Sequence, residues 1–283
     1  ESGCGKSTLA RVIAGLLPQV SGEIYHHGEN LRDTAKRRTR DVLKNIQIVF
    51  QMPDVAVNPR HRVREILGRP LHLFMGLDAG ARESRIDELL ELVELPASYK
   101  TRLPGELSGG EKQRINLARA LAASPEVLLC DEVISALDSI VGANVIELLR
   151  KLRKQTGVSF VFISHDLSTV ASFADEIIVL YAGRVVEKGT TDAVLSPPYH
   201  PYTRLLISSV PELRVGWLEE TMQTQEAQAG IDRVVTLTDK GCPFFDRCPR
   251  AIKDTCDQET PPVRMLSDGH AIECHLSEAE FAH

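Results

Sequence analysis

The sequence lacks the features of a membrane-spanning, disulfide-built or nucleic-acid-binding protein. It holds one Trp and 5% aromatic residues among 283. Its apolar runs have the length of strands and stay far below the roughly 20 residues that cross a bilayer, so we do not expect the chain to span a membrane. A formal net charge of −6 gives no general attraction for phosphate backbones, so nucleic acid is not an expected partner. Six Cys are too few and too unevenly placed for a disulfide scaffold.

The sequence does contain alternating helix and strand patterns. We expect a helix from Lys6 to about Leu17, a strand at 46–50, helices between 63 and 94, and a helix over 108–123. Apolar strands at 126–132 and 158–165 flank an amphipathic helix that ends at Gly157, and 176–189 has the pattern of a hairpin. Buried apolar strands separated by helices predict an α/β fold with a parallel sheet.

The first residues fit the end of the phosphate-binding pattern G-x-x-x-x-G-K-[ST]. The matching residues are Gly3, Cys4, Gly5, Lys6, Ser7 and Thr8. In this pattern backbone amides and a helix N-terminus hold phosphates, the Lys reaches the β- and γ-phosphates, and the Ser binds Mg²⁺. The first glycine of the pattern would lie one position before Glu1, so we expect the chain to be part of a longer polypeptide. A surface turn before a helix is the alternative interpretation.

Two acids and a histidine follow apolar strands further along the chain. Asp131 and Glu132 come directly after four apolar residues, so they are expected at the carboxyl edge of a buried parallel strand, where α/β proteins bind ligands. There Asp131 can hold Mg²⁺ and Glu132 can accept a proton from an attacking water. His165 ends the next strand and can sense a γ-phosphate, although a single His more often has a structural role.

The segment "LSGGEKQR" (107–114) predicts a second helix terminus that binds an anion. Ser108 is the expected N-cap, and Gly109 and Gly110 allow a close approach of the backbone to a ligand. Taken alone, the segment could be only a capped helix.

Together these motifs resemble those of the ATP-binding cassette (ABC) ATPases. The phosphate loop, Gln51, "LSGGE", "VLLCDE", "SALD" (135–138) and His165 occur in that family's order and approximate spacing. "QMPDVAVNPR" (51–60), "YHPYTRLLISSVPE" (199–212) and "CPFFDRCPRAIKDTC" (242–256) are similar to segments of the oligopeptide, dipeptide and nickel importer ATPases. The resemblance implies a P-loop NTPase fold with a helical subdomain over about 60–123, an ABC ATPase domain over 1–195 that lacks its N-terminal strands, and a Cys-containing extension over 196–283.

The resemblance also implies roles for individual residues. Lys6 and Ser7 would bind phosphate and Mg²⁺, Asp131 would complete the metal shell, and Gln51 would couple Mg²⁺ to the membrane partner. Glu132 would be the general base and His165 the γ-phosphate switch. Residues 108–110 would act on ATP held by a second cassette.

The implied partners are that second cassette, identical or different, two transmembrane permease subunits and, indirectly, a solute-binding protein. The chain would then be a peripheral ATPase on the cytoplasmic face of the inner membrane, energising import of peptides or a related small solute. The alternatives are a soluble cassette that acts on ribosomes or nucleic acid, and an inert truncated cassette.

Four of the six Cys lie near the C-terminus, with the spacing C-x5-C-x7-C-x17-C. They are Cys242, Cys248, Cys256 and Cys274. Four thiolates suit Zn²⁺ or a [4Fe–4S] cluster, and four free thiols packed as small apolar groups are the remaining interpretation. The resemblance to peptide importer ATPases favours an iron–sulfur cluster.

Overall fold

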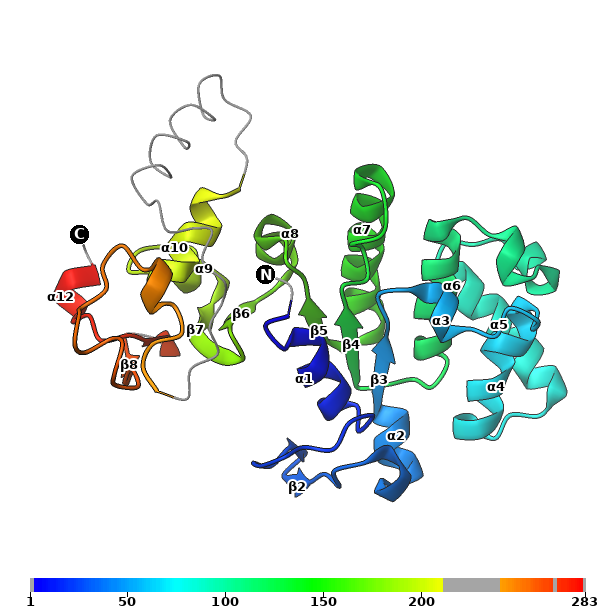
Figure 1. Cartoon of the computed structure of the whole chain (residues 1–283). Helices are drawn as coiled ribbons and strands as arrows, with labels where there is room; N and C mark the ends of the chain where they lie inside the picture. The colour runs from blue at the N-terminus through cyan, green and yellow to red at the C-terminus, as the bar shows by residue number, and fades with distance from the viewer. Residues whose placement is uncertain (1–2, 211–239, 267–268, 282–283) are drawn as a thin grey trace. The chain divides into compact units, whose positions relative to one another are not determined.

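The computed structural model describes residues 3–210, 240–266 and 269–281 (Figure 1). The chain divides into two compact units. The sheet unit comprises Ser7–Ser164, and the tail unit comprises Glu1–Lys6 together with His165–His283. The predicted boundary between residues 195 and 196 stays a prediction. None of the described helices is both long enough and apolar enough to span a membrane.

A three-stranded parallel sheet forms the centre of the sheet unit, in the order β3-β4-β5 (Figure 1). The helices and strands of this part of the chain are α1 (Lys6–Ile13), β1 (Tyr25–His26), β2 (Glu29–Asn30), α2 (Arg40–Asn45), β3 (Ile46–Val49), α3 (Pro53–Ala56), α4 (Val63–Met75), α5 (Ala79–Leu92), α6 (Gly109–Leu121), β4 (Val127–Asp131), α7 (Ser139–Thr156) and β5 (Ser159–Ile163), with 3₁₀ turns at Ala35–Arg37, Ala97–Thr101 and Pro104–Glu106. Ile48, Leu129 and Val161 lie side by side across the sheet. The parallel α/β arrangement predicted from the apolar strands is confirmed.

Helices α4, α5 and α6 pack against one another in the range expected for a helical subdomain (Figure 1). Each buries an apolar stripe at helical spacing, as for Ile86, Leu89 and Leu90 of α5. An amphipathic helix is stabilised mainly by such packing, because its intrinsic propensity is weak in water. The sequence pattern therefore predicted these helices well.

Helix α1 is shorter than the sequence pattern predicted. It ends at Ile13 because Gly15 adopts a left-handed conformation, with φ of 73°. A Cβ at this position would lie 2.8 Å from the backbone nitrogen of Ala35, so only glycine fits. The chain turns away there, and the expected extension to about Leu17 is wrong.

The tail unit is built on a four-stranded antiparallel sheet in the order β6-β7-β9-β8. Its elements are α8 (Leu167–Phe173), β6 (Glu176–Tyr181), β7 (Arg184–Thr190), α9 (Thr191–Val194), α10 (Pro201–Ser208), β8 (Val263–Met265), β9 (Ala271–Glu273) and α12 (Glu278–Phe281), with a 3₁₀ turn at Phe245–Arg247. The hairpin over 176–189 is confirmed. Strands β8 and β9 were not expected; they extend that hairpin's sheet with chain from the C-terminal extension. Residues 211–239 of the extension over 196–283 lie outside the described residues.

Three aromatic rings connect the hairpin to the chain that follows it. Tyr181 of β6 packs on Tyr202 of α10 and on Phe244, with ring centroids 4.6 and 5.2 Å apart. All three side chains are almost fully buried. Burial of such large rings contributes strongly to stability, so the C-terminal chain shares a core with the hairpin.

A buried carboxylate makes a second connection in the tail unit. Glu187 of β7 is 1% exposed and accepts hydrogen bonds from the backbone N–H of His200, at 3.0 Å, and from Nε2 of His270, at 2.8 Å. A buried carboxylate without such partners would be costly. Burial raises the pKa of Glu187, and its hydrogen bonds oppose that shift.

Removing the buried carboxylate is expected to destabilise the protein. In Glu187→Ala the His200 N–H and the His270 ring would stay buried without their partner, at a cost of about 3 kcal/mol of unfolding free energy. Urea denaturation followed by circular dichroism measures the loss. Glu176→Ala, at an exposed position of β6, is the control and should change stability by less than about 0.5 kcal/mol. Equal losses in the two variants would contradict this role of Glu187.

His200 gives stability a defined pH dependence. Burial lowers the pKa of His200 to about 3, below the usual value near 6.5. The unfolded chain therefore takes up a proton between these pH values that the folded chain does not, and unfolding free energy falls as pH drops. His200→Asn should remove up to about 1.4 kcal/mol per pH unit of this slope between about pH 6 and about pH 5, measured by urea denaturation. The exposed His72→Asn is the control, and an unchanged slope in His200→Asn would refute the assignment.

Candidate functional site

The phosphate-loop residues have the backbone conformation that such a loop needs. Gly3 and Gly5 have φ of 84° and 96°, a region that favours glycine. Cys4 is buried, and the Lys6 ammonium donates a hydrogen bond to its sulfur at 3.2 Å. Helix α1 begins at Lys6, directly after the loop, so its first backbone N–H groups are free of intrahelical partners. The exposed Thr8 follows in the first turn.

Two of the three residues predicted to bind Mg²⁺, which are Ser7, Gln51 and Asp131, are joined by a hydrogen bond in the sheet unit. The Ser7 hydroxyl, at the start of α1, donates a hydrogen bond of 2.8 Å to Oδ1 of Asp131, the last residue of β4. Asp131 is only 3% exposed. A hydroxyl beside a buried carboxylate is a hard-oxygen pair of the kind that Mg²⁺ prefers, so these residues fit the ion.

Glu132 and Gln51 also meet, at the same edge of the sheet. Gln51 follows β3 and donates hydrogen bonds from Nε2 to Oε2 of Glu132, at 3.1 Å, and to Oγ of Ser135, at 3.0 Å. Glu132 has a left-handed backbone, with φ of 48°, and its N–H donates to the carbonyl of Ile163 on β5. The carboxyl ends of three neighbouring strands therefore determine the position of this carboxylate.

Ser135 is a polar partner at this edge that the sequence did not single out. Its hydroxyl accepts from Gln51 and donates to the backbone carbonyl of Glu132 at 3.0 Å. It lies in "SALD", which was noted only as part of the family pattern. The "SALD" motif marked Ser135 in the sequence. Its contact with Gln51 could not be predicted from that motif, because the two residues are far apart in the chain.

The N-terminus of α6 is organised as the sequence predicts. Ser108 is its N-cap: its hydroxyl accepts from the N–H of Glu111 at 3.3 Å, and the Glu111 carboxylate accepts from the N–H of Ser108 at 2.7 Å. A hydrogen bond from the Tyr99 hydroxyl lowers the pKa of Glu111 and favours its charged form. Ser108 and Gly109 are exposed, so this helix terminus is accessible to a ligand.

Gly110 has a packing role that sequence reasoning missed. A Cβ at this position would lie 2.6 Å from a methyl group of Val141 on α7, whereas a Cβ at Gly109 would be in ordinary contact with Leu137. The glycine therefore brings the start of α6 close to α7.

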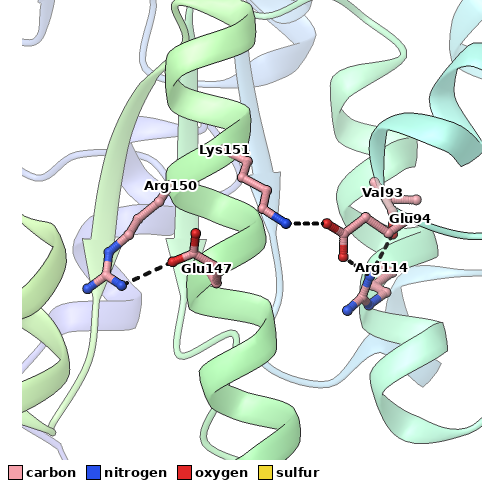
Figure 2. Close-up of polar contacts among 6 residues, drawn as sticks. All are labelled: Val93, Glu94, Arg114, Glu147, Arg150 and Lys151. Atoms are coloured by element: carbon pink, nitrogen blue, oxygen red, sulfur yellow. Dashed lines mark hydrogen bonds and ion pairs between the residues drawn. The ribbon is translucent and has the colours of Figure 1, made fainter.

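A charged bridge also joins α6 to α7 (Figure 2). Glu94, just after α5, accepts hydrogen bonds from Nη1 of Arg114 on α6, at 3.0 Å, and from Nζ of Lys151 on α7, at 2.6 Å. Arg114 also donates to the carbonyl of Val93 at 2.9 Å. The hydrogen bonds from Lys151 and Arg114 lower the pKa of the Glu94 carboxyl. This bridge supports the position of the helix that carries Ser108.

His165 lies two residues after β5 and is exposed. It begins the second segment of the tail unit, His165–His283, whereas Glu132 and Gln51 belong to the sheet unit. Its role as a γ-phosphate switch stays a prediction.

Four thiols gather in the tail unit. All four are free of disulfides, and each lies partly or fully buried. The pKa of Cys242 is raised to about 11 and that of Cys248 to about 12, mainly by burial and to a smaller extent by Cys274 and Cys256. Burial and Cys256 likewise raise the pKa of Cys274. These sulfurs are therefore within electrostatic reach of one another.

Backbone amides point at these sulfurs. The N–H of Ile252 donates to Cys256 Sγ at 3.4 Å, and backbone hydrogen bonds from Phe244 and Arg250 lower the pKa values of Cys242 and Cys248, against the larger effect of burial. Amide donors of this kind stabilise negative charge on sulfur. Four buried or partly buried thiols that affect one another electrostatically, with such donors beside them, have the chemistry to hold a thiolate-bound metal or cluster.

The comparisons with known proteins agree with these motifs. Residues 1–135 match the family described as ABC transporter, and residues 186–256 match the family described as Oligopeptide/dipeptide transporter, C-terminal region. A putative peptide import ATP-binding protein of Brucella abortus (strain 2308) is 43% identical over 277 residues, which are 98% of this chain and 80% of that protein. The dipeptide transport ATP-binding protein DppF of Haemophilus influenzae is 40% identical over 275 residues, 97% of this chain and 82% of that protein.

Solved structures with the same fold include two cassettes. The ATP-binding cassette MJ0796, a dimer in a post-hydrolysis state bound to ADP and phosphate, gives a TM-score of 0.58 at 30% identity, over 68% of this chain and 82% of that chain. cbiO1 of Clostridium perfringens, part of the ABC transporter complex cbiONQ, gives a TM-score of 0.64 at 26% identity, over 79% of this chain and 84% of that chain. The chain belongs to the ABC transporter family, as an ATP-binding subunit of the oligopeptide and dipeptide importer type.

Proposed function

We propose that this chain hydrolyses ATP to energise the import of peptides. The observation that best supports this proposal is a pair of hydrogen bonds at the carboxyl ends of neighbouring parallel strands. One joins Ser7 to Asp131, and the other joins Gln51 to Glu132. That edge is where α/β proteins bind nucleotides. The peptide cargo is inferred from the relatives, several of which are named as peptide, dipeptide or oligopeptide import or transport ATP-binding proteins.

Glu132 is the proposed general base. Its carboxylate can accept a proton from a water that attacks the γ-phosphate in line, and a hydrogen bond from Gln51 holds it in position. The bond from its backbone N–H to Ile163 limits movement of the residue. A base held on rigid elements loses little entropy when it orients the water.

Ser7 and Asp131, together with Gln51, form the proposed Mg²⁺ site, and the phosphate-loop pattern assigns phosphate binding to Lys6. The Lys6 ammonium would neutralise phosphate charge, and Ser7 and Asp131 would hold Mg²⁺, which supplies further positive charge when bound. The Ser7–Asp131 hydrogen bond supports this assignment because it already brings the two oxygen ligands together.

The partners follow from the exposed α6 terminus and from the relatives. Ser108, Gly109 and Gly110 would contact ATP held by a second cassette, so the active form would be a dimer. This dimer would bind two transmembrane permease subunits at the cytoplasmic face of the inner membrane, with a solute-binding protein delivering peptide. The relatives give no support to action on ribosomes or nucleic acid, or to an inert cassette.

Replacing the proposed base tests the function. In Glu132→Gln the side chain cannot accept the proton, so kcat for ATP hydrolysis should fall by about 10²–10⁴-fold in the complex with the permease subunits. ATP should still assemble dimers, as measured by light scattering, because phosphate binding is intact. The exposed Glu91→Gln of α5 is the matched control and should keep wild-type activity. Undiminished hydrolysis in Glu132→Gln would reject Glu132 as the base.

We also propose that Cys242, Cys248, Cys256 and Cys274 hold a [4Fe–4S] cluster. The electrostatic effect of these thiols on one another and the amide donors beside them support a bound group of this kind. The raised pKa values of Cys242, Cys248 and Cys274 mean that without a metal these three would be neutral thiols. A cluster would cross-link the chain around 242–256 to β9 and act as a structural clamp.

Metal analysis of the anaerobically purified protein tests the cluster. Four iron atoms and four acid-labile sulfides per chain are expected, as for any [4Fe–4S] cluster, together with visible absorption. Cys256→Ser should lose most of the iron, whereas Cys4→Ser, outside the group, should retain it. Zinc without sulfide would replace the cluster with a Cys₄ zinc site, and the absence of both would leave four free thiols.

A further inference from the structure

Two histidines and a glutamate converge at the opposite end of the sheet unit from the catalytic edge. Nε2 of His26 lies 3.1 Å, and Nε2 of His27 lies 2.6 Å, from the same carboxylate oxygen, Oε2 of Glu126. The three ligand atoms all lie within 4.8 Å of one another. The His26 side chain is only 16% exposed, whereas those of His27 and Glu126 are more accessible.

The backbone of the hairpin explains how neighbouring histidines can face one target. In a regular strand successive side chains point to opposite faces, so His26 and His27 would diverge. His27 instead has a left-handed backbone, with φ of 51°, at the turn between β1 and β2. The two rings lie edge to face, with centroids 4.3 Å apart, and both reach Glu126.

Both sides of the cluster are held by other contacts. The N–H of Glu126 donates to the carbonyl of Asn45 at 3.0 Å, and its carbonyl accepts from the N–H of Ser159 at 2.9 Å, so the last residue of α2 and the first residue of β5 hold the backbone of Glu126. In the hairpin, Glu23 accepts hydrogen bonds from Tyr25 and Asn30. Because these contacts already hold the backbone of the site, binding of an ion costs little further conformational entropy.

We propose that His26, His27 and Glu126 form a site for a divalent transition-metal ion, with Zn²⁺ as the best match. Two imidazoles and one carboxylate are a known zinc ligand set that leaves a fourth position open. Zinc–ligand bonds of 2.0–2.2 Å at tetrahedral angles place ligand atoms about 3.3 Å apart. The His26–Glu126 separation already fits, and His27 has to move outward by less than about 1 Å.

This site is separate from the nucleotide and from the cysteine group. Glu126 precedes β4 and Asp131 ends it, so the two ends of one strand lie roughly 17 Å apart. An ion here would link the β1–β2 hairpin to the start of β4. Zinc would therefore stabilise the hairpin against the sheet without entering the hydrolytic reaction.

Zinc binding to untagged, full-length protein tests the proposal. Equilibrium dialysis should give about one zinc more per wild-type chain than per chain of the His26→Gln/His27→Gln double variant, because three ligands hold one ion. Glu126→Gln should weaken binding at this site at least about tenfold. The exposed His72→Gln of α4 is the matched control and should bind as the wild type does. Zinc at the cysteine group is common to all four proteins and cancels in these differences.

Chemical labelling of wild-type protein gives a readout that no substitution can disturb. Zn²⁺ should protect His26 and His27 from diethyl pyrocarbonate, as measured by peptide mass spectrometry, because coordination occupies the reactive nitrogen. Labelling of His72 should not change. Equal zinc content in the wild type and the double variant, or labelling of His26 and His27 that zinc does not reduce, would overturn the proposal and leave the cluster as an ion pair.

Discussion

The hydrogen bond between Ser7 and Asp131 fixes the geometry on which the proposed catalytic edge depends. Asp131 is almost fully buried at the end of β4, and a carboxylate in that position needs a polar partner. The Ser7 hydroxyl supplies one, and it belongs to the first turn of the helix that follows the phosphate loop. The start of α1 is thereby tied to the central strand of the parallel sheet. The N-terminus of α1, the Ser7 hydroxyl and the Asp131 carboxylate then face the same region. A helix N-terminus favours a phosphate, and the two oxygen groups favour a metal ion, so the phosphate and its ion can bind side by side.

The parallel register carries this arrangement to the neighbouring strands. Because β3, β4 and β5 run in the same direction, the residues that follow them emerge at one edge. Gln51 and Glu132 meet there although 81 positions separate them. An antiparallel pairing of β3 with β4 would have placed them at opposite ends. The sheet thus converts short motifs scattered along the chain into one site.

The sequence predicted the parallel strands and the longer helices of the sheet unit, and it singled out the polar residues that follow those strands, because apolar strands, caps and glycines are local signals; the catalytic roles of these residues stay predictions. It did not predict that β8 and β9 would extend the hairpin's sheet, since these strands are short and their pairing is made by distant chain. The buried Glu187 was missed for the same reason: nothing near it in sequence shows that His200 and His270 surround it. "HH" at 26–27 was visible, but its meaning depends on Glu126, about a hundred residues away.

The contact of Gly110 with Val141 has a consequence for motion in the sheet unit. With no side chain at Gly110, the first turn of α6 lies directly against α7, and the Glu94 bridge joins the same two helices further along. Two attachments along their length prevent one helix from sliding or rotating past the other. A displacement of the "LSGGE" end of α6 would therefore move α6 and α7 together as one rigid unit. The "SALD" segment, directly before α7, would move with them.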